Sequence, residues 1–153
     1  MIDLYSVSVA PGGSERLLPY LKACLKRASR EGAIDAALCS GSRADLLIVP
    51  PGAAPPREIP GSLLLTVGQP AAPGGRSVSC GLGYGDALTL SSIGRDRALL
   101  ALQEDIPALT GELLEPQEIP LSLHSPAEPE AVLAAAGAML LLGADASEGL
   151  KLP

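Results

Sequence analysis

Cys80 and His124 are the two side chains in this chain that could in principle pair for covalent catalysis. A thiol beside an imidazole can serve as a nucleophile with its general base. His124 is the only histidine, however, and it lies among serine and proline in a stretch that we interpret as a loop. A cysteine within a strand is more often a small buried apolar residue. We therefore name no catalytic residue, and the sequence leans against an enzyme.

Glycines alternate at Gly81, Gly83 and Gly85, directly after Cys80. The spacing differs from the dinucleotide fingerprint G-x-G-x-x-G, and a strand-like segment follows it rather than the helix that would bind a pyrophosphate. A tight turn between strands explains the spacing, because glycine relaxes the backbone there. The alternative is a site where the backbone approaches a small ligand.

A second candidate lies at "PGGSER", where Gly12, Gly13 and Ser14 follow the first predicted strand. Ligands bind at the carboxyl ends of strands in open α/β sheets, and helix N-termini attract anions. Glu15 already brings negative charge to that helix start, so Ser14 acting as an ordinary N-cap is the simpler interpretation. A phosphate or carboxylate site is the alternative.

Carboxylates recur at Glu112, Glu115 and Glu118. Such groups can do acid–base work or hold a cation. The segment contains two prolines and no other convergent polar group, which favours an exposed acidic loop. Three scattered cysteines and one histidine lack the spacing of metal ligands. We predict no metal and no cofactor.

The charge balance excludes some partners. The net charge is −6 and only 2% of residues are aromatic, so the chain lacks the basic surface and the stacking platforms of nucleic-acid-binding proteins. Up to residue 100 there are ten basic and eight acidic residues, whereas from residue 101 nine acidic residues accompany Lys151 alone. A solvated acidic face explains this asymmetry, and a docking surface for a basic partner is the alternative.

The sequence predicts a cytoplasmic protein without a membrane segment. The N-terminus has no basic region of a signal peptide and already resembles a strand. The longest apolar run, residues 131–142, is too short to span a bilayer. We expect Cys24, Cys39 and Cys80 to be reduced thiols.

The elements that must position these residues change character along the chain. The first half reads as strand 2–9, a helix with the apolar face Leu17, Leu21, Cys24, Leu25 and Ala28 that ends at Gly32, and strands 34–39, 44–49 and 62–67. The strands at 44–49 and 62–67 are continuous apolar runs, as in parallel sheets buried on both faces. The proline-rich segment 50–60 is a surface connection.

The second half reads as short antiparallel strands and a closing helix. Strands 87–93 and 97–103 form a hairpin around Gly94, residues 110–111 turn a second hairpin, and residues 119–123 alternate as a strand does. A helix then runs from Ala127 to about Leu142 and stops at Gly143. We predict one α/β domain over residues 1–153, with a Rossmann-like parallel sheet followed by antiparallel strands and the closing helix.

This second half resembles the later part of the central domain of Mur ligases. The resemblance covers about residues 62–144 and rests on a strand ending near Thr66, on "CGLGYGDALTLSSI", on "IPLSL" and on the helix "EAVLAAAGAMLLLGA". It implies a related fold. The ATP-dependent ligase activity of that family does not carry over, because the chain has no GK dipeptide for a phosphate loop. "TVGQP" stands where the family has Asn-x-Asp, and the HN motif is missing near Ala127.

Two functions remain open at this point. The first is a non-catalytic binding or assembly module with a protein partner or a second copy of itself. The alternative is a small-molecule or anion-binding domain, degenerate from a nucleotide-binding ancestor. It would use Gly12 to Ser14 and Gly81 to Gly85. The sequence names no ligand for it.

Overall fold

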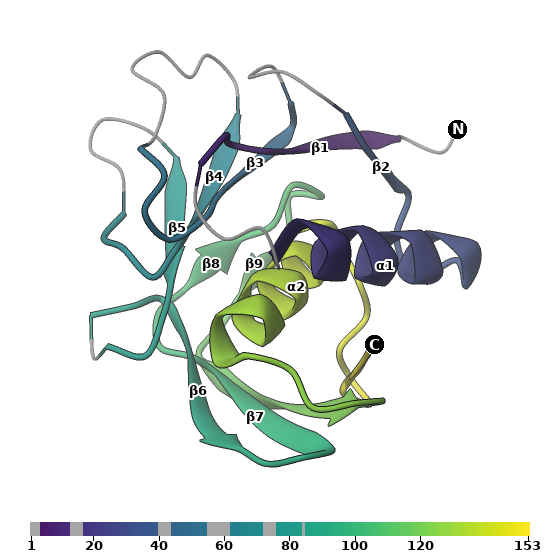
Figure 1. The fold of residues 1–153 in the computed structure, drawn as a ribbon, viewed down its shortest axis with the longest axis vertical. Helices are drawn as coiled ribbons and strands as arrows, with labels where there is room; N and C mark the ends of the chain where they lie inside the picture. The colour runs from purple at the N-terminus through teal and green to yellow at the C-terminus, as the bar shows by residue number, and fades with distance from the viewer. Residues whose placement is uncertain (1–3, 13–16, 40–43, 55–61, 72–75, 84) are drawn as a thin grey trace.

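The computed structural model describes the chain except for residues 1–3, 13–16, 40–43, 55–61, 72–75 and 84 (Figure 1). Two helices and eleven strands are assigned in the described part. They are β1 Tyr5–Val9, α1 Leu17–Arg30, β2 Ala36–Leu38, β3 Leu46–Val49, β4 Leu63–Val67, β5 Ser77–Cys80, β6 Leu88–Ile93, β7 Arg97–Leu102, β8 Ile106–Pro107, β9 Leu113–Leu114, β10 Gln117–Leu123, α2 Pro129–Leu141 and β11 Leu150–Leu152.

Nine of the strands form one sheet in the order β11-β10-β7-β6-β5-β4-β3-β1-β2. The first five strands in the chain are all parallel, in the order 2-1-3-4-5. Doubly wound folds of the flavodoxin type share this order. In the second half β7 pairs antiparallel with both β6 and β10, and β11 pairs in parallel with β10. The predicted α/β fold class is therefore confirmed.

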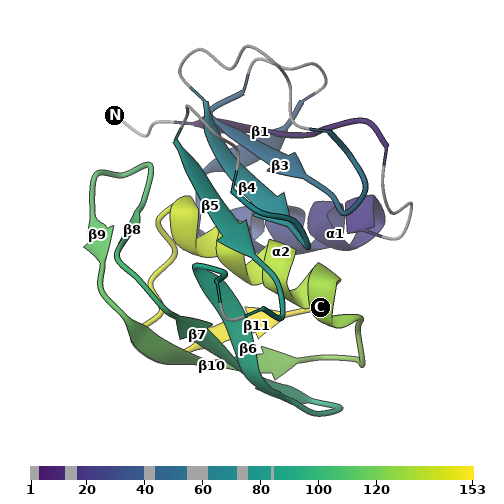
Figure 2. The ribbon, with the colours of Figure 1, turned by 90° about the vertical axis from the view of Figure 1, so that its left-hand side faces the viewer.

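The two halves of the sheet meet at a single pair of residues, Cys80 of β5 and Leu88 of β6. Parallel neighbours normally require a crossover of a dozen residues or more. Here the first residue of β6 pairs with the last residue of β5, and β6 then continues away from β5. The seven residues 81–87 are therefore enough to connect the two strands. Figure 2 shows the consequence, with the parallel half above and the antiparallel half below, and α2 lying between them.

The helix α2 is buried on every side. All residues from Ala131 to Leu141 are buried, and the helix packs against strands of both halves of the sheet. A helix that is apolar all round needs such an enclosed position. It starts at Pro129, two residues later than predicted. Its end is closed by hydrogen bonds from Gly143 N–H to Leu140 O and from Ala144 N–H to Met139 O.

The helix α1 buries the predicted face, namely Leu17, Leu21, Cys24, Leu25 and Ala28. Its opposite side exposes Lys22, Lys26 and Arg30. The cap predicted at Ser14 lies outside the described residues. No described helix is long and apolar enough to cross a membrane.

The second half contains both predicted hairpins and one strand that was not predicted. The strands β6 and β7 turn at Gly94, whose N–H donates to Arg97 O. The strands β8 and β9 form a separate two-stranded sheet. β11 pairs in parallel with β10 and was not predicted, because a strand of three residues carries too little pattern to be identified.

The docking of β11 depends on Gly149, and this yields a testable prediction. Gly149 has φ +84°, and a Cβ there would lie 2.6 Å from the backbone oxygen of Pro120. Gly149→Ala therefore adds a clash with backbone to the cost of about 1–2 kcal/mol for the left-handed conformation. We expect it to lower the free energy of unfolding by more than that amount, measured by urea denaturation.

Gly52→Ala is the matched control. Gly52 has φ +83° and no described atom within 4 Å of the added Cβ, so it incurs the conformational cost alone. Equal losses of stability in the two variants would contradict the proposed clash at β11.

Candidate functional site

The carboxyl ends of β1, β3, β4 and β5 lie along one edge of the parallel half, where ligands bind in open α/β sheets. The loops that follow these strands contact one another. The Gln69 side-chain amide donates to the backbone oxygens of Pro50 at 2.8 Å and Ala53 at 3.1 Å. A Cβ at Gly12 would lie 3.8 Å from Ala53. The described parts of these loops thus form a connected rim.

In the glycine turn that follows β5, backbone and side-chain groups form hydrogen bonds with Asp86. Asp86 accepts a hydrogen bond from Gly83 N–H at 2.9 Å, and the Gln103 side-chain amide donates to Asp86 O at 2.6 Å. A Cβ at Gly81 would come within 2.7 Å of the Asp86 carboxylate, so a larger residue there would force the Asp86 side chain to shift. The N–H of Gly83 is therefore already bound within the turn. At Gly85 an added Cβ would meet no described atom within 4 Å, so no close contact requires glycine there.

A second carboxylate reaches the same edge from the start of α2. Glu130 Oε2 lies 3.1 Å from the position of a Cβ on Gly68. The nearby Cys80 is fully buried, and burial, followed by the charges of Asp86 and Glu130, raises the pKa of its thiol. These two carboxylates place negative charge at the edge where open α/β sheets bind their ligands.

The two candidate glycine segments lie on this edge but not beside each other. β3 and β4 separate β1 from β5, so Gly12 and Gly81 follow strands about 14 Å apart. Gly13 and Ser14 lie outside the described residues. The structure therefore does not bring Gly12 and the turn at Gly81 to Gly85 together around one small ligand.

Cys80 and His124 are likewise far apart. The register aligns Cys80 with Leu88, Leu88 with Leu102, and Leu102 with Gln117. His124 comes seven residues after Gln117, which corresponds to more than about 20 Å along the strand direction. Cys24 is also unavailable, since it is buried with its sulfur 3.4 Å from the sulfur of Met139.

The three predicted carboxylates, Glu112, Glu115 and Glu118, are all exposed. Glu112 and Glu115 flank β9, and Glu118 lies on β10. Within the described residues no group of three or more His, Cys, Asp or Glu side chains could hold a metal ion.

The structure adds a surface that the sequence did not reveal, on the hairpin β8–β9. Pro107 and Leu113 are paired directly across this hairpin, and both are exposed, Leu113 by 58%. Four exposed carboxylates, Glu104, Asp105, Glu112 and Glu115, precede or follow these two strands. We call the apolar pair and the four carboxylates together the hairpin surface: Pro107, Leu113, Glu104, Asp105, Glu112 and Glu115. The repeated carboxylates of this surface are visible in the sequence. The apolar pair is not, because it depends on the register between β8 and β9.

The carboxylates at the strand edge predict that the chain does not bind ATP. Asp86 and Glu130 oppose a tetra-anionic ligand, and the chain has no GK dipeptide that would supply a phosphate-binding lysine. Calorimetric titration with magnesium-ATP should show no binding tighter than about 100 μM. A tighter dissociation constant would overturn this expectation. The same titration of Glu130→Gln tests whether the carboxylate alone prevents binding.

The burial of the cysteines predicts that one thiol of three reacts in the folded protein. Cys39 is exposed, whereas Cys24 and Cys80 are buried. Burial raises the pKa of Cys24 to about 12 and that of Cys80 further still, so both remain protonated and shielded at pH 8. Titration with a chromogenic disulfide should show one fast thiol before unfolding and three after it. Cys39→Ser should remove the fast phase, and a fast thiol left in that variant would contradict the assignment.

No family model, curated protein or solved structure matches this chain. The relationship to Mur ligases stays a prediction.

Proposed function

We propose that this protein is a non-catalytic binding module that docks a basic protein partner through the hairpin surface. The observation that carries the proposal is the exposed pair Pro107–Leu113 with carboxylates around it. Interfaces gain most of their energy from a few apolar anchors, while surrounding charges select and orient the partner. Lysine or arginine beside an apolar side chain is the chemistry that complements this surface.

The hairpin is held rigidly, which supports a role in binding. Leu109 N–H donates to Leu141 O at 2.8 Å, so the turn of the hairpin is fixed to the end of α2. Ile106 and Ala108 point into the core and are buried. A surface that is already ordered loses less entropy on binding than a flexible one.

The charge distribution supports a basic partner. The hairpin surface belongs to the part of the chain in which nine acidic residues accompany Lys151 alone. Exposed charge of one sign accelerates encounter with a partner of the opposite sign, and salt weakens this effect. The same charge disfavours nucleic acid and anionic membranes as partners.

The positions of the reactive side chains support a non-catalytic role. Cys80 is fully buried, and the strand register separates it from His124. The three cysteines are free thiols, and a cytoplasmic location is part of this proposal. The alternative of an anion-binding domain at the strand edge is less well supported because Asp86 and Glu130 lie there.

The proposal is tested with a short peptide of alternating lysine and leucine as the probe, titrated into the isotopically labelled protein. We expect amide shifts confined to residues 104–118, a dissociation constant below about 1 mM at low salt, and weaker binding at higher salt. Glu112→Gln together with Glu115→Gln should weaken binding at least threefold, and Leu113→Ser should weaken it further.

The control is Asp96→Asn together with Glu148→Gln, which removes the same charge from exposed positions outside the hairpin surface. An equal loss of affinity in this control would show that only net charge matters. That result, or amide shifts centred elsewhere, would refute the proposed surface.

A further inference from the structure

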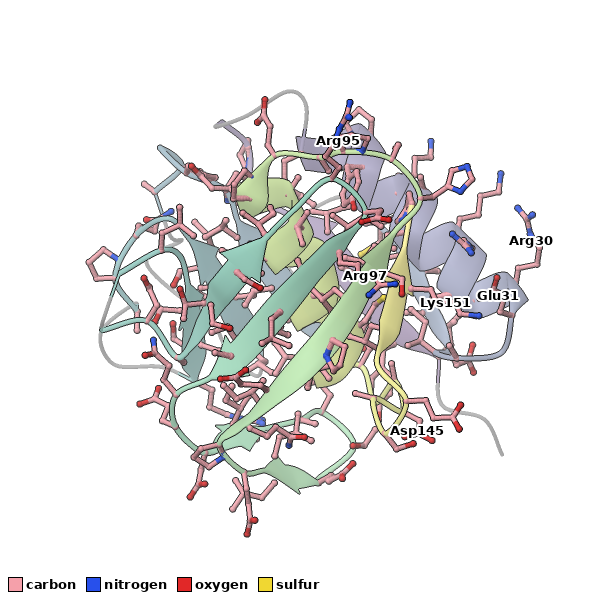
Figure 3. The ribbon with its side chains drawn as sticks, turned by 90° about the horizontal axis from the view of Figure 1, so that it is seen from below. Arg30, Glu31, Arg95, Arg97, Asp145 and Lys151 are labelled. Carbon is pink, nitrogen blue, oxygen red and sulfur yellow. The ribbon has the colours of Figure 1, made fainter. Side chains whose placement is uncertain are left out.

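The antiparallel half of the sheet has one face that no described element covers. Figure 3 looks onto this face from below, with the helices behind the strands. From Glu118 onward the burial pattern of β10 alternates, so Ile119, Leu121 and Leu123 point inward, whereas Glu118, Pro120 and Ser122 point outward. We call the outward set the open face: Thr89, Ser92, Arg97, Leu99, Ala101, Glu118, Pro120, Ser122 and Lys151.

The open face has three rows, set by the strand register. Glu118 and Ala101 are paired in the first row, Pro120 and Leu99 in the second, and Ser122 pairs with both Arg97 and Lys151 in the third. The face thus carries an acid at one end, two bases at the other and an apolar pair in the middle. Figure 3 shows Arg97 and Lys151 close together, with Arg95 at the margin of the sheet.

This distribution is self-complementary. Consider two copies whose open faces are opposed and related by a two-fold axis that lies between the faces, nearly perpendicular to the strands. The rotation reverses the strand direction of the second copy, so the first row of one copy lies opposite the third row of the other. Glu118 of each copy then faces the Arg97 and Lys151 end of its partner, and the Pro120–Leu99 rows face each other. Isologous dimers are built on this relation, in which each contact occurs twice. We propose that the open face is the interface of a homodimer.

The geometry of packed sheets is compatible with this arrangement. Facing sheets lie about 10 Å apart, with strand directions within about 30° of each other. Arginine, lysine and glutamate are long enough to meet across that gap, and the small side chains between them allow the two sheets to approach. Leu99 and Ala101 are half-buried, whereas Glu118, Pro120, Ser122, Arg97 and Lys151 are exposed and free to form contacts.

The size of the face indicates that the dimer is weak. β6, β7 and β10 are about 20 Å long and β11 about 10 Å, so at about 4.8 Å per strand they cover roughly 340 Å² per copy. The total of about 700 Å² is below the 1,200 Å² or so of stable interfaces. We therefore expect a dissociation constant on the order of 100 μM, with monomer at about 10 μM and mostly dimer at about 1 mM.

The test is sedimentation velocity of the full chain over this concentration range, with charge-reversal variants. Glu118→Lys sets lysine against the bases of the partner, and Arg97→Glu sets two acids against each other. Each variant alone should weaken dimerisation at least fivefold. An equimolar mixture of the two should restore it in part, because the new lysine then faces the new glutamate beside Lys151, while the unchanged Glu118 faces the unchanged Arg97 and Lys151. Far-ultraviolet circular dichroism checks that both variants are folded.

Glu31→Lys and Lys26→Glu are the matched controls, since both residues are exposed, on α1 or directly after it, and α1 packs against α2 and β2 rather than the strands of the open face. They should leave dimerisation within twofold of the unchanged protein. A wild type that is monomeric at about 1 mM would overturn the proposal. So would a dimer that both open-face variants leave intact, or a mixture that fails to recover. None of these outcomes bears on the hairpin surface, which the peptide titration tests separately.

Discussion

The enclosure of α2 is the constraint on which the rest of this structure depends. A helix that buries every residue from Ala131 to Leu141 must be surrounded by apolar elements. The two halves of the sheet, which pair with each other only at Cys80 and Leu88, lie on opposite sides of the helix, and α1 also packs against it. At Gly137 a Cβ would lie 3.1 Å from Leu88 and 3.2 Å from Leu65, one residue from each half. Glycine allows the helix to approach both halves at once.

This enclosure decides which surfaces remain for binding. Because α2 occupies the inner side of the antiparallel half, the open face is left on the outside. Because the end of α2 binds the turn of the β8–β9 hairpin through Leu141, that hairpin presents Pro107 and Leu113 in a fixed position. The start of α2 brings Glu130 to the edge of the parallel strands, where it opposes anions. One buried helix thus sets the character of three surfaces.

The two proposed surfaces call for different kinds of partner. The hairpin surface is acidic with an apolar centre and complements a basic protein. The open face has opposite charges at its two ends and complements itself. Since they lie on different elements, a dimer formed through the open face would present two hairpin surfaces. Two weakly binding surfaces on one particle raise the effective affinity for a partner with repeated basic segments.

The local pattern of the sequence determined most of the elements. The apolar face of α1, the parallel strands β3 and β4, the two hairpins and the closing helix follow from periodicity and turn residues, because side-chain spacing and backbone preferences act over a few residues. The tertiary structure alone decided the separation of Gly12 from the Gly81 turn, the distance between Cys80 and His124, the pairing of β11, and the surfaces formed by Pro107–Leu113 and Pro120–Leu99. These depend on strand order and register between residues distant in the chain, and no local pattern encodes which strand lies next to which.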